Sequence, residues 1–188
     1  QKADFTFYGG LYRMVNLVTV PENHFCMEYA GSNGIKVTPE VTILDAGAKK
    51  ADAEVTVELW IEGKSADVMV TVGGEKKSVP VEHGYAKAVF DLTDVHLWDG
   101  VDDPYLYTAK AELSDGDSVE TTFGCRSFSI DPQKGFFLNG RSYPLRGVSR
   151  HQDRAGAGNA LTNEMHREDM EIIKELGANT IRLAHYQH

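Results

Sequence analysis

The residues best suited to chemistry lie near the end of the chain, at the ends of two apolar runs. His151 closely follows the run Tyr143–Val148, whereas Arg182 and His185 lie within and just after the run Thr180–Ala184. Two histidines at equivalent strand ends indicate a functional site, because imidazole groups can donate and accept hydrogen bonds at neutral pH. The alternative is that each histidine is a surface residue whose hydrogen bonds are satisfied within its own loop.

A metal site would need a further ligand, and His188 is the nearest histidine in the sequence. His185 and His188 are three residues apart, so an extended chain would direct their side chains to opposite faces. The chain also has only two cysteines, which are not in CxxC spacing. We therefore expect no metal and no other cofactor to be bound by these residues.

The segment around these side chains has the pattern of a βαβ unit. A strand over Tyr143–Val148 leads into the polar loop Ser149–Asn159, and a helix then runs from an N-cap at Thr162 to a C-cap glycine at Gly177. The second strand, Thr180–Ala184, follows directly. Such a unit implies a parallel sheet, in which functional residues lie beyond the carboxyl ends of the strands. Parallel pairing would therefore bring the two histidines to one rim.

The carboxylates near this rim have simpler interpretations than catalysis. Glu164 falls in the positive first turn of the helix, and Asp169 is expected to be a charge on the helix surface. Asp153 is placed to orient neighbouring side chains by hydrogen bonding.

The first 130 residues show the period-2 pattern of antiparallel strands, separated by turn signals. The Asp-Gly pair at 115–116, between two alternating runs, is typical of a hairpin. Strands at this spacing predict an immunoglobulin-like sandwich, with no catalytic constellation inside it. The expected strands are Leu11–Val20, Phe25–Tyr29, Ile35–Leu44, Ala53–Ile61, Asp67–Val72, Tyr85–Leu92, Tyr105–Leu113 and Ser118–Ile130.

The burial of four side chains in the sandwich can be interpreted in two ways. We place Trp60 and Trp98 in the core, although tryptophans can also line a carbohydrate-binding face. We interpret Cys26 and Cys125 as two buried free thiols, and a disulfide between them is the alternative.

Composition and charge exclude several classes of function. No apolar run approaches the roughly 20 residues of a membrane span, so we expect no membrane protein. Residues 131–188 hold 8 Lys and Arg and 7 Asp and Glu, whereas the first 130 residues hold 11 and 21, a formal charge of −10. An acidic segment of this kind argues against nucleic-acid binding, which needs a basic surface. The shift in charge marks a domain boundary near Asp131–Pro132.

Motifs over nearly the whole chain resemble glycoside hydrolase family 2, in its β-galactosidase branch. They occur in the order of the family, from about residue 7 to the end. The matching stretches are Leu97-Trp98, Pro104–Tyr107, Phe123–Phe128, Phe137–Gly140, Arg146–Asp153, Leu176–Asn179 and Ile181–Tyr186.

The resemblance implies the order of domains in such enzymes: a sugar-binding jelly roll, an immunoglobulin-like sandwich and a TIM barrel. Residues 1–20 would be the tail of the jelly roll, although a simple first strand is an alternative for the segment that starts at Phe7. Residues 21–130 would be the sandwich, and residues 131–188 the first strands and helix of a truncated barrel. The predicted fold class is therefore mainly β, a sandwich followed by a βαβ piece of a TIM barrel.

The resemblance also implies roles for the site residues. His151 and His185 would bind hydroxyl groups of the non-reducing sugar. Arg182 would position the nucleophilic carboxylate and keep it ionised. Relatives often have Asn, Glu and Pro where this chain has Ser149, Gln152 and Gln187, and these differences affect which sugar is bound.

The catalytic residues themselves are not expected in this chain. Retaining glycosidases use two carboxylates about 5–5.5 Å apart, and the resemblance places both of them, with the ligands of any magnesium ion, on later barrel strands. We therefore expect an inactive fragment of a retaining enzyme that cleaves terminal β-galactosides. The apolar faces of its two barrel strands would then pack irregularly or drive self-association.

Two alternatives stay open. The chain could be a non-catalytic carbohydrate-binding or spacer module, or part of a β-glucuronidase or β-mannosidase of the same family. In each case we expect a soluble, bacterial protein of the cytoplasm or periplasm, without nucleic-acid or membrane partners.

Overall fold

The structure, a computed structural model, describes residues 9–27, 29–114 and 116–185. Contacts divide the chain into two compact units. One unit runs from Thr19 to Tyr143, and the other combines the described residues up to Val18 with those from Pro144 onward.

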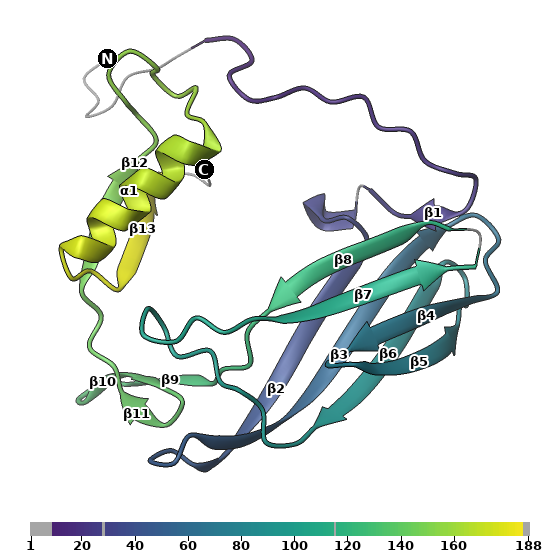
Figure 1. Ribbon diagram of the computed structural model, residues 1–188, viewed down its shortest axis with the longest axis horizontal. Coiled ribbons are helices and arrows are strands. Elements are labelled where there is room, and N and C mark those ends of the chain that lie inside the picture. The colour runs from purple at the N-terminus through teal and green to yellow at the C-terminus, as the bar shows by residue number, and fades with distance from the viewer. Residues whose placement is uncertain (1–8, 28, 115, 186–188) are drawn as a thin grey trace. The chain divides into compact units, whose positions relative to one another are not determined.

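The first unit is a sandwich of two four-stranded antiparallel sheets (Figure 1). In one sheet β3 pairs with β1, β2 and β6, and in the other the order is β5-β4-β7-β8. The strands are β1 (His24–Phe25), β2 (Ile35–Asp45), β3 (Lys50–Glu62), β4 (Asp67–Val72), β5 (Glu75–Pro80), β6 (Tyr85–Leu92), β7 (Tyr107–Leu113) and β8 (Ser118–Phe123). A short 3-10 helix, η1 (Tyr29–Gly31), lies between β1 and β2.

The core of the sandwich follows from strict alternation along β3. Val55, Val57 and Leu59 are fully buried, and they belong to one cluster with Val70 of β4 and Phe90 of β6. Burying a side chain of this size stabilises the fold by about 1.5–3 kcal/mol. The intervening residues of β3 point to the outer face, so the sequence pattern alone fixes which side of the sheet is internal.

Four segments differ from the strand predictions. Within the described residues, the predicted strand Phe25–Tyr29 is a strand only at Phe25, with Tyr29 in η1, and the predicted strand Ser118–Ile130 ends at Phe123 and resumes at Phe128. No strand forms over Leu11–Val20, where Leu17 is 96% exposed, because alternation cannot make a strand without a partner for its backbone groups. In addition, β5 was not among the predicted strands, and its residues include Lys76 and Lys77. Charged residues suit β5 because it lies at the edge of its sheet, where lysine discourages pairing with other chains.

The tryptophan prediction is wrong for Trp60, and Trp98 is only partly buried. The prediction of free thiols is confirmed for both cysteines, and the prediction of burial is confirmed for Cys125. Leu59 and Ile61 of β3 are buried, so Trp60 lies on the outer face, where it is partly exposed. Cys26 and Cys125 are free thiols, although Cys26 is only partly buried. Burial raises the pKa of Cys125 to about 11.

A small antiparallel sheet of β9 (Phe128–Asp131), β10 (Gly135–Leu138) and β11 (Arg141–Ser142) continues the first unit. It is fixed to the sandwich by the buried carboxylate of Asp99, which pairs with Arg141 and, at 2.7 Å, with Nζ of Lys49. Asn139, which is 1% exposed, donates to the backbone oxygen of Trp98 at 3.0 Å. These contacts group the hairpin with the sandwich, up to Tyr143.

The second unit contains the predicted βαβ arrangement. Its elements are β12 (Gly147–His151), α1 (Asn163–Glu175) and β13 (Thr180–Ala184). The Thr162 hydroxyl accepts a hydrogen bond from Met165, and Gly177 has a φ of 80°, which confirms both predicted caps. β12 begins later than predicted and includes His151 as its last residue. None of the helical segments in the described part of the chain has the length and apolarity needed to cross a membrane.

Candidate functional site

The site is built on the parallel pair β12 and β13. Their register sets Ser149 beside Arg182 and His151 beside Ala184. Paired residues of adjacent strands share a face, and successive residues alternate between faces. Ser149, His151 and Arg182 therefore lie on one face of the pair, and His151 is at the carboxyl end of β12.

The two predicted histidines come together at this rim. The rings of His151 and His185 have their centroids 5.2 Å apart and are nearly perpendicular, at 87°. The peptide bond between Ala184 and His185 is cis. The structure therefore confirms that the two side chains converge, whereas their contact with a sugar stays a prediction.

Arg182 lies next to the histidine pair. Its Nη2 is 3.2 Å from Nδ1 of His185. A guanidinium can only donate hydrogen bonds, so Nδ1 of His185 is the acceptor and the ring proton is on Nε2. Its partner Arg182 is exposed, and both side chains are accessible to a bound molecule.

The opposite face of β12 is fixed to the helix by a buried ion pair. Arg150, only 7% exposed, donates from Nε and Nη2 to Oδ2 of Asp169, at 3.0 and 2.5 Å. Its Nη2 is also 2.9 Å from Nδ1 of His166. The interpretation of Asp169 as a plain surface charge is therefore wrong. Because Arg150 and His151 are adjacent, anchoring one fixes the direction of the other.

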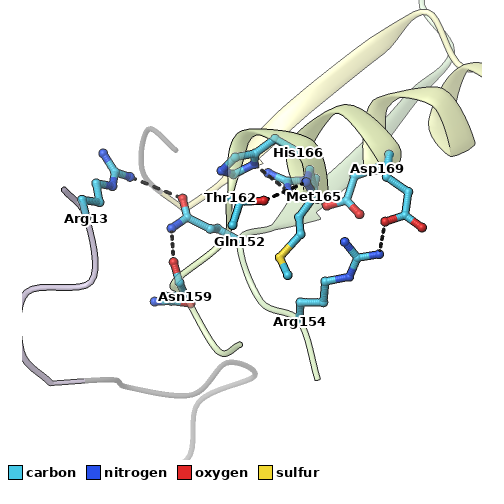
Figure 2. Close-up of polar contacts among 10 residues, drawn as sticks. Arg13, Gln152, Arg154, Asn159, Thr162, Met165, His166 and Asp169 are labelled. Carbon is cyan, nitrogen blue, oxygen red and sulfur yellow. Dashed lines mark hydrogen bonds and ion pairs between the residues drawn. The ribbon is translucent and has the colours of Figure 1, made fainter. Parts of the chain in front are cut away.

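A second polar contact holds the loop after β12. Gln152, 4% exposed, donates from Nε2 to the backbone oxygen of Asn159 at 2.7 Å and accepts from Arg13 at 3.3 Å (Figure 2). These residues line a cavity of about 570 Å³ together with Thr162 and His166. This cavity could not be predicted from the sequence, because Arg13 is far from the loop along the chain.

Three carboxylates of this unit, Glu164, Glu168 and Asp169, hold the fold or the helix end. Glu168 pairs with Arg154. The pKa of Glu164 is lowered by a hydrogen bond from its own backbone N–H and then by the Thr162 hydroxyl. A general acid needs a raised pKa, so Glu164 is unsuited to that role. Contacts are recorded for Asp153, but its predicted orienting role stays a prediction.

Metal binding has no support in the described residues. Within 9–27, 29–114 and 116–185, no group of three or more His, Cys, Asp or Glu side chains is arranged to hold an ion. His188, the third member of the histidine set considered above, lies outside these residues.

The chain thus combines an antiparallel β-sandwich with a βαβ unit of the kind that begins a barrel of alternating strands and helices. Residues 28–126 match the family model of glycosyl hydrolases family 2, and residues 130–188 match that family's TIM barrel domain. The chain belongs to glycoside hydrolase family 2, and its last residues form the start of the barrel domain.

The relatives include two kinds of glycosidase. The chain is 38% identical to a β-glucuronidase of Bacteroides fragilis over 97% of its own length and 28% of that protein. It is 29% identical to a β-galactosidase of Thermoanaerobacterium thermosulfurigenes, over 97% of its length and 26% of the relative. The crystal structure of an FMN-binding β-glucuronidase from Facaelibacterium prausnitzii L2-6 superposes with a TM-score of 0.88 at 44% identity, covering 100% of this chain and 30% of that one. The chain thus spans less than a third of each of these proteins.

Proposed function

We propose that this chain supplies part of the sugar-binding site of a retaining β-glycosidase. The observation that carries the proposal is the convergence of His151 and His185, with their rings 5.2 Å apart at the ends of two parallel strands. Functional residues of barrel enzymes lie at this end of the strands. His151 and His185 bind hydroxyl groups of the terminal sugar.

Arg182 has the role of positioning the catalytic nucleophile. In a retaining mechanism one carboxylate attacks the anomeric carbon while the other protonates the leaving group, and water then hydrolyses the glycosyl-enzyme. Both carboxylates come from barrel strands other than β12 and β13. An arginine next to the nucleophile keeps that carboxylate ionised and fixes its direction through charge-assisted hydrogen bonds. Any magnesium ion of the enzyme has its ligands outside the residues described above.

A terminal β-glucuronide is the first candidate for the substrate, because the Bacteroides fragilis and Facaelibacterium prausnitzii relatives are both named β-glucuronidases. A terminal β-galactoside is the second, supported by the Thermoanaerobacterium enzyme and by the motifs in the sequence. The two sugars differ in a carboxylate at C6, so comparing the two substrates decides between them.

The test uses the enzyme that contains this chain, with p-nitrophenyl β-glucuronide and β-galactoside as substrates. We expect hydrolysis of one of them, no hydrolysis by the 188-residue chain alone, and a loss of about 10²–10³ in kcat/KM for His151→Ala or His185→Ala. Glu168→Gln is the matched control, because it changes an exposed ion pair of α1, and it should retain activity. Turnover by the isolated chain would show that the carboxylates have been misplaced.

A further inference from the structure

Three aromatic rings gather on the outer face of the sandwich, where the pattern of β3 otherwise places Thr56 and acidic residues. Trp60 of β3 stands beside Tyr85 of β6 in the register. Tyr29 of η1 stacks on Trp60 with centroids 3.6 Å apart and an interplanar angle of 12°, and Tyr85 meets Trp60 edge-on at 5.8 Å. Tyr29 is 40% exposed, so this aromatic platform (Tyr29, Trp60 and Tyr85) is open to solvent.

A charged row borders the aromatic platform. The register aligns Lys36 of β2, Glu58 of β3 and Lys87 of β6. Lys36 donates to Glu58 at 2.9 Å, and the hydroxyl of Tyr85 donates to the other oxygen of Glu58 at 3.1 Å. The hydrogen bond from Lys36 holds the pKa of Glu58 below its usual value despite the opposing effect of burial, so the carboxylate is ionised at neutral pH. Two ammonium groups and one carboxylate leave this row with a net positive charge.

The spacing of the two rows fits one sugar ring. Outward positions along a strand are two residues apart, which is about 6.7 Å. A pyranose placed with its apolar C–H face on the aromatic platform would therefore carry its substituents over the charged row. Both lysines are exposed, with the side chain of Lys36 at 59%, so their remaining N–H donors can reach a ligand.

A protein partner fits this surface less well than a sugar. A stable protein interface buries about 800 Å² on each side, whereas the aromatic platform consists of three side chains bordered by charges. Farther along the sheet lies an acidic row at matching register positions, made up of Glu40, Glu54 and Asp91. An anionic ligand would be repelled from that end and attracted to the lysines, which fixes its direction on the sheet.

We propose that the aromatic platform, with Lys36 and Lys87, is a non-catalytic binding site for a uronate-bearing pyranose. The ring stacks on Tyr29, and the carboxylate of the sugar pairs with the two ammonium groups. The site belongs entirely to the sandwich unit and includes none of the residues assigned to the candidate catalytic site. It therefore does not rest on the proposed enzymatic function.

The test is an NMR titration of the ¹⁵N-labelled 188-residue chain with a hyaluronan tetrasaccharide, which carries glucuronate, and with the neutral cellotetraose. We expect saturable shifts at the amides around Tyr29, Trp60 and Tyr85, with hyaluronan binding about tenfold more tightly. Shifts confined to β12 and β13, no saturable shifts with either sugar, or equal affinity for both sugars would each overturn the proposal.

Single and double variants separate the contribution of the Tyr29 ring to binding from that of the two lysines. Tyr29→Ala should weaken binding about tenfold, because it removes the ring on which the pyranose stacks, and Tyr29→Phe should keep the affinity within about twofold, because the ring is retained. The Lys36→Gln/Lys87→Gln variant leaves all three rings in place and should abolish the preference for the acidic sugar. Lys110→Gln is the matched control, since Lys110 forms a similar exposed pair with Glu112 at 2.6 Å on the other sheet. An equal loss of affinity in Lys110→Gln would also contradict the proposal.

Discussion

Replacing Asp99 with alanine should destabilise the sandwich unit, because its carboxylate joins the β9–β11 sheet to the rest of the unit. The side chain of Asp99 is 6% exposed and pairs with both Lys49 and Arg141. Removing one member of a buried ion pair costs about 3–5 kcal/mol when the remaining charge stays buried. Here the side chains of Lys49 and Arg141 are 45% and 41% exposed and can turn into water, so the loss should be smaller, about 2–3 kcal/mol.

The assay is thermal and urea unfolding of the 188-residue chain, followed by circular dichroism. For a unit of this size, the expected loss corresponds to a fall in Tm of roughly 6–12 °C. Glu112→Ala is the control, because Glu112 and Lys110 form a pair with both side chains about 40% exposed. It should change the free energy of unfolding by about 0–1 kcal/mol.

The difference between Asp99→Ala and the wild type should depend on pH. Burial by itself would raise the pKa of Asp99, but hydrogen bonds from Lys49 and Arg141 outweigh it, so the folded-state pKa lies below its usual value. A lowered pKa gives stability that is fully present above the unfolded value and is lost as the pH falls through the folded value. The gap in unfolding free energy should therefore be constant from pH 7 to about 5 and shrink below pH 4. A gap no larger than that of Glu112→Ala, or one unchanged down to pH 3, would refute this reasoning.

Three further outcomes are expected. Asp169→Asn should destabilise the βαβ unit by about 2–4 kcal/mol, because it leaves the buried guanidinium of Arg150 without a charged partner. The control Glu168→Gln should cost less than about 1 kcal/mol, and amide hydrogen exchange in β12 measures both losses. Cys125 should react with iodoacetamide more slowly than Cys26 at pH 8, because burial raises the pKa of its thiol to about 11. Mass spectrometry measures the two rates, and equal rates would contradict this expectation. Gly34→Ala should lower Tm by several degrees, since Gly34 has a φ of 77° and an added Cβ would lie 2.8 Å from the Cys26 backbone; an unchanged Tm would count against that packing.

The sandwich could be predicted where its strands are half-buried. The alternation in β3, β4 and β6 encodes both the strand and its inner face, and the predicted limits of β4 and β6 are those observed. β5 escaped prediction because an edge strand makes few core contacts, so its sequence carries charges instead of an apolar period. The position of Trp60 was not predicted, because an aromatic residue is as suitable on an outer face, beneath Tyr29, as in a core.

The candidate site was predictable to the level of strand ends. The β–loop–helix–β pattern and the rule for parallel strands were enough to bring His151 and His185 together. The partners of Arg150 and Gln152 were not predictable, because contacts between a strand and residues of α1 or the Arg13 segment depend on tertiary packing. The position of Asp169 in the helix pattern did not indicate that its carboxylate would accept hydrogen bonds from a buried arginine.

The ion pair between Arg150 and Asp169 also favours one register of β12 against β13. A strand that slips by one residue turns every side chain to the other face. Such a slip would turn Arg150 to the rim and His151 against Asp169, exchanging a guanidinium with two hydrogen bonds for an imidazole. The misaligned strand would lose both its salt bridge and the contact between His151 and His185, so the pairing of β12 with β13 that keeps the ion pair is also the pairing that brings the two histidines together.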